Sequence, residues 1–405
     1  MDIFVARQAI LDRRLEVYGY ELLFRSCLNN SFDGDDDNLA SAHVISNSFF
    51  SIGAEKILGG KRAFINFTRD LLIDEQASIL PPHIAIIEVL ETVERDAEVV
   101  AACRNLKSRG YLLALDDFVV QPSDPLTDLA DIIKVDFRAT TRAEQEALMR
   151  LYGCRGIRML AEKVERREEF EWARQIGYSL FQGYFFARPV VFSSREVPGF
   201  KLNYLRLLQE MHSSELEYGH VESLIQREMS LSHKLLRYVN SAAFYARNQV
   251  QSIRQALVFL GEKEIRKWIS LVTLLDLAVD KPSELIVAAI LRARFCESLA
   301  PCIGLSKRSS DLFLMGMFSL LDAIVDRPLE ELLAELHLPD DVRDVLLEKA
   351  RPGDRLAAVY SLARAYEAAD WPLLSEVADR LGVPKGRIAE IYVDSVNWSD
   401  RIFQA

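Results

Sequence analysis

The stretch YLLALDDFVVQPSD, residues 111–124, begins as an apolar run and ends with two adjacent aspartates, Asp116 and Asp117. A short apolar run of this kind is typical of a strand buried on both faces of a parallel sheet. Burying an isolated carboxylate at the end of such a strand costs roughly several kcal/mol of folding free energy, unless the carboxylate is paired or binds a metal. We therefore expect a strand that ends in a functional site.

Six further apolar runs resemble this one. They are residues 16–24, 63–67, 84–89, 131–135, 157–161 and 179–186. Helix-like segments separate most of them, and two of these segments end in Gly110 and Gly177, as helices often do. Strands and helices that alternate in this way predict a parallel α/β fold, and so many repeats favour a closed TIM-like barrel.

The pattern changes near residue 200, after which the apolar residues recur with helical spacing. Pro189 and Pro198 mark residues 190–200 as the linker. The sequence thus predicts two domains, a barrel over residues 1–195 and an all-α domain over residues 196–405.

Composition narrows the class of protein. The 405 residues carry a net charge of −11, and neither half has the basic excess of a duplex-binding protein, so we expect no duplex nucleic acid as partner. No apolar run is long enough for a membrane span, and no signal peptide is evident, so we expect no membrane association. Five scattered cysteines without a C-x-x-C pair favour the reducing cytoplasm.

Polar side chains interrupt one apolar run after another near its carboxyl end. They are Glu21, Asn66, Glu88, Asp116, Asp117, Lys134, Asp136, Glu162, Glu165 and Gln182. A parallel barrel gathers its strand ends on one face, where active sites lie. Carboxylate and amide oxygens suit Mg²⁺ or Mn²⁺, and two such ions bridged by an aspartate would clamp a phosphodiester. The alternative is a structural ring of salt bridges.

The same residues resemble a known family. The segment YGYELLFR is similar to the E-A-L-x-R signature of EAL-domain cyclic di-GMP phosphodiesterases, with Leu22 in place of the alanine. In the same order follow RQAI, INFT, IEVLE, LDDF, IKVD, AEKVE (similar to A-E-G-V-E) and FQGYFFARP. The resemblance runs from about residue 3 to 189 and implies hydrolysis of cyclic di-GMP to the linear dinucleotide pGpG.

The resemblance also implies a role for each position. Metal ligation falls to Glu21, Asn66, Glu88, Asp116 and Asp117, with Glu165 completing the metal shell. Lys134 would position the attacking water, and Glu162 would be the general base. Gln8, Arg25 and Gln182 would contact the nucleotide, and Glu91 would anchor the loop after Asp117.

That loop departs from the family. The family motif is D-D-F-G-T-G-Y-S-S-L, whereas here DDF is followed by VVQPSDPL. Val119 and Val120 do not readily adopt the backbone angles that glycines permit. In the family this loop organises the metal site and the dimer contact, so a homodimer through the barrel depends on it.

The helical part resembles HDOD domains. Residues 231–269 resemble the pattern L-S-x-K-L-L-R-x-V-N-S-A-x-F followed by S-I-x-x-A-[IV]-x-x-L-G. These domains are helical relatives of HD phosphohydrolases without the metal ligands, and no histidine of this chain precedes an aspartate. We expect Asn240 to cap or bridge helices, and the domain to act through a protein partner.

Three hypotheses follow. In the first, the barrel is a degenerate EAL domain that binds cyclic di-GMP, with weak hydrolysis at most, and the HDOD domain relays the signal. In the second, the chain is an active metal-dependent phosphodiesterase. In the third, both domains are scaffolds for protein assembly. The replaced loop separates the first two, and the retained polar set separates both from the third.

Overall fold

The computed structural model describes residues 4–25, 57–74, 81–118, 124–187, 208, 218–227, 229–240, 250–336 and 338–404. The chain forms two compact units. The first contains residues 1–188 together with 358–405, and the second contains residues 189–357.

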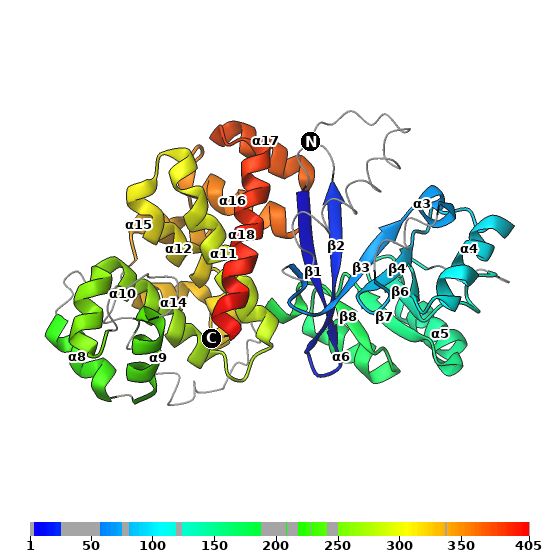
Figure 1. Cartoon of the computed structure of the whole chain (residues 1–405), viewed down its shortest axis with the longest axis horizontal. Helices are drawn as coiled ribbons and strands as arrows, with labels where there is room; N and C mark the ends of the chain where they lie inside the picture. Colours follow the sequence, from blue (N-terminus) through cyan, green and yellow to red (C-terminus); the bar gives the residue numbers. More distant parts are fainter. Residues whose placement is uncertain are drawn as a thin grey trace. The chain divides into compact units, whose positions relative to one another are not determined.

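Eight strands close into a barrel in chain order, as predicted (Figure 1). They are β1 (Phe4–Asp12), β2 (Val17–Arg25), β3 (Arg62–Phe67), β4 (Ala85–Val89), β5 (Leu112–Leu115), β6 (Ile132–Asp136), β7 (Arg158–Glu162) and β8 (Leu180–Gln182). Strands β2 to β8 are parallel, but β1 runs antiparallel to both β2 and β8. The sequence pattern missed β1 because Arg7 and Gln8 interrupt its apolar residues.

Helices connect the parallel strands. They are α3 (Arg69–Ile73), α4 (Ala97–Ser108), α5 (Arg142–Tyr152) and α6 (Arg167–Ile176), with 3₁₀ turns at Gly153–Arg155 and Tyr184–Ala187. The second turn shortens the strand expected over residues 179–186. Asp96 caps α4 by accepting from the Val99 amide at 2.9 Å, and Gly177 ends α6 with a φ of 118°.

One apolar layer fills the inside of the barrel. It consists of Ile10, Phe64, Ile86, Ala114, Ile132, Leu160 and Leu180, all buried. Gly19 belongs to the same layer, because a Cβ there would lie 2.8 Å from the Arg62 carbonyl oxygen and 3.2 Å from the Phe64 ring. The Arg62 carbonyl oxygen therefore excludes a side chain at position 19, and the Phe64 ring fills the adjacent space.

Three C-terminal helices belong to the barrel unit: α16 (Arg355–Glu367), α17 (Trp371–Leu381) and α18 (Lys385–Gln404). The Phe4 ring lies 6.1 Å from the Trp371 ring, and the Tyr366 hydroxyl donates to the Val5 carbonyl oxygen at 3.3 Å. Sequence periodicity had placed residues from 196 onward in one helical domain. Periodicity identifies helices, but it does not show against which surface a helix packs.

The second unit is helical, as predicted. Its helices are α8 (Tyr218–Arg227), α9 (Met229–Val239), α10 (Ile253–Leu277), α11 (Ser283–Leu299), α12 (Ser309–Phe318), α13 (Leu321–Val325), α14 (Leu329–Glu335) and α15 (Asp340–Leu346), with 3₁₀ turns at Pro301–Ile303 and Ser306–Arg308. The bridging role expected of Asn240 is confirmed, since its amide donates to the Leu236 and Val250 carbonyl oxygens at 2.8 and 2.9 Å. Within the described residues, no helix is both long and apolar enough to cross a membrane.

The packing of α17 on β1 can be tested by hydrogen exchange. Trp371 is only 8% exposed, whereas Leu373 on the same helix is 37% exposed. Removing a buried tryptophan side chain costs about 3–5 kcal/mol. We expect Trp371→Ala to accelerate amide exchange in a peptide that covers Phe4–Asp12, and Leu373→Ala to leave it nearly unchanged. Unchanged exchange of this peptide in Trp371→Ala would show that α17 does not support β1.

Candidate active site

Each strand of the barrel places one polar side chain next to the apolar layer, at the same end of the barrel. These are Gln8, Glu21, Asn66, Glu88, Asp116, Lys134, Glu162 and Gln182, where Asp116 directly follows β5. We call this set the mouth ring. Each member lies two residues from a position of the apolar layer on its own strand, and alternate residues of a strand share a face. The strand register aligns Gln8 with Glu21 and Asn66 with Glu88.

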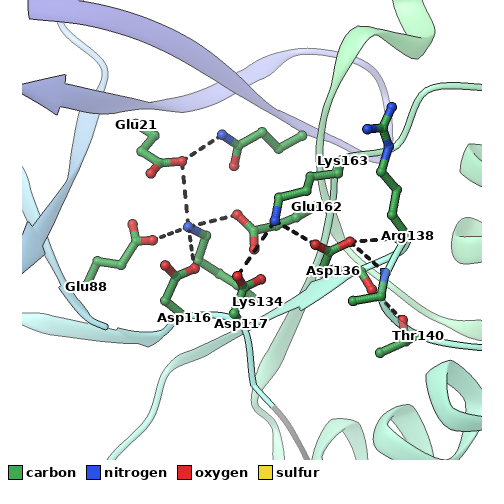
Figure 2. Close-up of polar contacts among 12 residues, drawn as sticks. Glu21, Glu88, Asp116, Asp117, Lys134, Asp136, Arg138, Thr140, Glu162 and Lys163 are labelled. Carbon is green, nitrogen blue, oxygen red and sulfur yellow. Dashed lines mark hydrogen bonds and ion pairs between the residues drawn. The ribbon is translucent and has the colours of Figure 1, made fainter. Parts of the chain in front are cut away.

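The Lys134 ammonium lies at the centre of the mouth ring (Figure 2). Its Nζ is 2.9 Å from Asp116 Oδ1, 2.8 Å from Glu162 Oε1 and 3.6 Å from Glu21 Oε2. It also forms an ion pair and a hydrogen bond with Glu88 Oε1. One cation thus contacts four carboxylates from four different strands.

Burial controls the protonation of these groups. The side chains of Lys134 and Glu88 are 1% and 0% exposed. Burial alone would lower the pKa of Lys134, but the surrounding carboxylates outweigh it and raise that pKa, so the ammonium stays charged. Loss of solvent raises the pKa of Glu88 well above its usual range and that of Glu162 to about 8, although Lys134 opposes both shifts.

Amide side chains orient the carboxylate of Glu21. Gln182 Nε2 donates to Glu21 Oε2 at 2.7 Å and approaches Gln8 Oε1 at 3.1 Å. Asn66 Nδ2 donates to Glu21 Oε1 at 3.3 Å. Both oxygens of Glu21 therefore have a donor, and the antiparallel strand β1 completes the ring through Gln8.

Several oxygens of the site lack a hydrogen-bond donor. Buried and unpartnered are Asn66 Oδ1, Glu88 Oε2, Asp117 Oδ1 and Gln182 Oε1. A buried acceptor without a donor costs about 1–3 kcal/mol, and an oxygen-rich pocket with excess negative charge suits a hard divalent cation. Asp116, Asp117 and Glu162 also offer oxygens that lie within 4.8 Å of one another. The residues present therefore fit a divalent metal.

A second lysine lies at the edge of the mouth ring. Lys163 Nζ is 2.6 Å from Asp136 Oδ2 and 3.7 Å from Asp117 Oδ2 (Figure 2). Sequence reasoning assigned no role to Lys163, although it stands where the family pattern A-E-G-V-E has glycine. That departure was the signal that could have identified it.

Three of the expected site residues lie apart from the ring. Glu165 pairs with Arg138, and its backbone amide donates to Glu169 Oε2 at 2.9 Å. Glu91 is exposed in the turn after β4. Burial is the main cause that raises the pKa of Asp117, followed by the charges of Asp116 and Asp136, and the charge of Glu91 adds less than any of these. Arg25 is half-buried at the end of β2, four residues beyond Glu21 and so on the same face of the strand.

The replaced loop after Asp117 lies partly outside the described residues, which stop at Phe118 and resume at Asp124. The residues on both sides of this loop, Phe118 and Asp124, have defined contacts. The Phe118 amide donates to the Lys134 carbonyl oxygen at 3.1 Å, and Asp124 pairs with Arg95, whose guanidinium lies 5.6 Å from the Phe118 ring.

Comparison with known proteins identifies both parts of the chain. The EAL domain family matches residues 38–189, and the HDOD domain family matches residues 197–326. The uncharacterized protein YuxH of Bacillus subtilis is 36% identical over the full length of both chains. The chain belongs to the EAL–HDOD family.

A further relative of this EAL–HDOD protein is the cyclic di-GMP phosphodiesterase CdgJ of Vibrio cholerae, which is 35% identical over 98% of this chain and 93% of CdgJ. Among solved structures, the manganese and cyclic di-GMP complex of Klebsiella pneumoniae BlrP1 matches with 26% identity and a TM-score of 0.39. That match covers 45% of this chain and 55% of BlrP1.

The role of Lys134 as counter-charge leads to a stability test on the EAL–HDOD protein. Removing one partner of a buried ion pair costs about 3–5 kcal/mol, because the remaining charges stay buried. We expect Lys134→Ala to lower the melting temperature in EDTA, and Mn²⁺ to restore more stability to this variant than to the wild type. Calorimetric melting would measure both.

Lys107→Ala is the matched control, because Lys107 Nζ pairs with both oxygens of Asp131 at 2.7 Å, outside the mouth ring. This variant should lose little stability and respond to Mn²⁺ as the wild type does. An equal response of the two variants would contradict a charge role for Lys134.

Proposed function

We propose that the barrel binds cyclic di-GMP together with a divalent cation, Mg²⁺ or Mn²⁺, and hydrolyses it slowly to pGpG. The observation that carries the proposal is the mouth ring, in which an excess of buried carboxylates surrounds one ammonium and several acceptor oxygens lack a donor. The activity named for CdgJ, which matches over nearly the whole chain, supports the same substrate.

Glu21, Asn66, Glu88 and Asp116 would hold the cation, with Asp117 beside them. The cation would supply positive charge to the phosphate and lower the pKa of a bound water. Glu165, which pairs with Arg138, would need to move to join them.

The proton chemistry falls to Glu162 and Lys134. Water would attack phosphorus and its proton would pass to the Glu162 carboxylate. The bond from phosphorus to the 3′ oxygen would break, that oxygen taking a proton from solvent, and Glu162 would later release its proton to solvent. Lys134 Nζ lies 2.8 Å from Glu162 Oε1 and stabilises its charged form, which is the form that accepts a proton. Lys134 would lie beside the attacking water, because its ammonium contacts both Glu162 and Asp116.

Gln8, Gln182 and Arg25 would contact the nucleotide. The glutamines belong to the ring, and Arg25 extends the same face of β2 toward the mouth, where its charge would meet a phosphate. We assign the slow turnover to the sequence VVQPSD after Phe118, which replaces the glycine-rich loop of the family.

The helical unit is proposed to bind a protein partner. Among the described residues, the one cluster of three metal-ligating side chains lies in the barrel and none lies in the helical unit. Val258 and Phe259 on α10 are 71% and 47% exposed, which gives this unit an apolar surface. We also propose that the barrel forms a homodimer.

The proposed reaction is tested with Glu162→Gln, which removes the proton acceptor but keeps the shape of the side chain. We expect pGpG formation to fall by about 100- to 10,000-fold, the usual contribution of a general base. Binding of cyclic di-GMP in the presence of Mn²⁺, measured by calorimetric titration, should persist. Glu98→Gln is the control, because Glu98 is 71% exposed and pairs with Arg69 away from the site.

The other outcomes separate the remaining hypotheses. Tight binding by the wild type without pGpG, abolished in Glu21→Ala, would make the barrel a sensor. If the titration at high ligand concentration gave no heat and no product, the proposal would be refuted and only the scaffold hypothesis would be left.

A further inference from the structure

Lys163 has a backbone conformation that lysine seldom adopts. Its φ is +54°, in the left-handed region that favours glycine, and the family pattern has glycine at this position. A contact with the end of β8 holds this turn in place, because the Val164 amide donates to the Gln182 carbonyl oxygen at 3.0 Å. A Cβ on Gly183 would lie 2.0 Å from the Val164 carbonyl oxygen, so the two segments are in the closest contact. The chain thus carries a lysine at a position whose backbone conformation favours glycine.

The side chain of Lys163 turns toward two carboxylates. Nζ is 2.6 Å from Asp136 Oδ2 and 3.7 Å from Asp117 Oδ2. Asp136 is held in place, since its Oδ1 accepts from the amides of Arg138 and Ala139 at 2.6 and 3.0 Å. The ion pair with Asp136 therefore holds the half-exposed ammonium of Lys163 beside Asp117.

Asp117 is the carboxylate that a second cation would need. With Asp116 and Glu162 it forms the group of oxygens within 4.8 Å of one another, and its Oδ1 is buried without a donor. The other oxygen, Oδ2, is the one that faces Lys163 (Figure 2). An ammonium at this distance repels a divalent ion and competes with it for the same carboxylate.

We propose that Lys163 acts as a tethered cation that replaces one of two divalent ions at Asp117, so that the barrel holds a single divalent ion. This inference rests on the proposed metal site and concerns its stoichiometry. The retained ion is the one next to Glu21, Asn66, Glu88 and Asp116. Lys163 offsets the charge of Asp117 and Asp136 at the edge of the mouth ring. Lys163 is thus a positioning residue, whose charge arranges Asp117.

The test counts Mn²⁺ ions bound to the full chain, by equilibrium dialysis combined with the electron paramagnetic resonance signal of free Mn²⁺. The wild type should bind one ion. Lys163→Gln keeps a polar, unbranched side chain, one bond shorter than that of lysine, and the strained backbone, but it removes the charge. It should bind two ions, with the second at least about tenfold tighter than any second ion of the wild type. Lys163→Gly should also bind two.

Two controls separate charge from conformation. Lys163→Arg keeps the charge and should stay at one ion, while Lys107→Gln removes a lysine that pairs with Asp131 elsewhere and should also stay at one. Circular dichroism and the melting temperature would verify that each variant is folded.

Each remaining result counts against the inference. Two ions on the wild type would overturn it while leaving the proposed function intact. One ion on both the wild type and Lys163→Gln would overturn it as well, because the charge would then not set the count. No ion on any form of the chain would refute the metal site itself, and with it both proposals.

Discussion

The ammonium of Lys134 is the charge on which the mouth of the barrel depends. Four carboxylates from four strands converge on it, and two of the side chains involved have almost no contact with water. Carboxylates buried at this density repel one another and lose hydration, so the strands can bring them together only around a positive charge. The excess of negative charge that remains is what fits the ring to a divalent cation.

The geometry of the barrel explains why the ring is complete. Side chains alternate along a strand, so a polar position two residues beyond an apolar one shares its face. In seven strands the apolar member belongs to the buried layer of the interior, and in β2 the place is taken by Gly19 beside the Phe64 ring. The same two-residue spacing, repeated on every strand, thus gives the barrel a buried apolar layer next to a charged ring.

Neighbouring side chains of strand β1 contact both the ring inside the barrel and the helix α18 outside it. Gln8 contacts Gln182 inside the ring, while the neighbouring Arg7 pairs with Asp400 of α18 at 3.5 Å. Adjacent residues of a strand point to opposite sides. Gln8 therefore faces the ring inside the barrel, while Arg7, the residue before it, faces the C-terminal helix α18. The boundary between the compact units therefore does not follow the order of the sequence, and the last 48 residues, from 358 to 405, support the first strand.

The sequence by itself determined the closed barrel, the helical second part and the positions of the polar residues, because the period of apolar residues and the ends of strands are local properties of a chain. It also marked the departure from the family after Phe118, whereas the significance of Lys163 emerged only from its contacts with Asp136 and Asp117. Only the tertiary structure decided that β1 enters the barrel antiparallel, that Trp371 packs with Phe4, and that Glu165 turns to Arg138 rather than to the ring. These features depend on contacts between distant segments, and on the balance of charge among side chains from different strands, which no local pattern records.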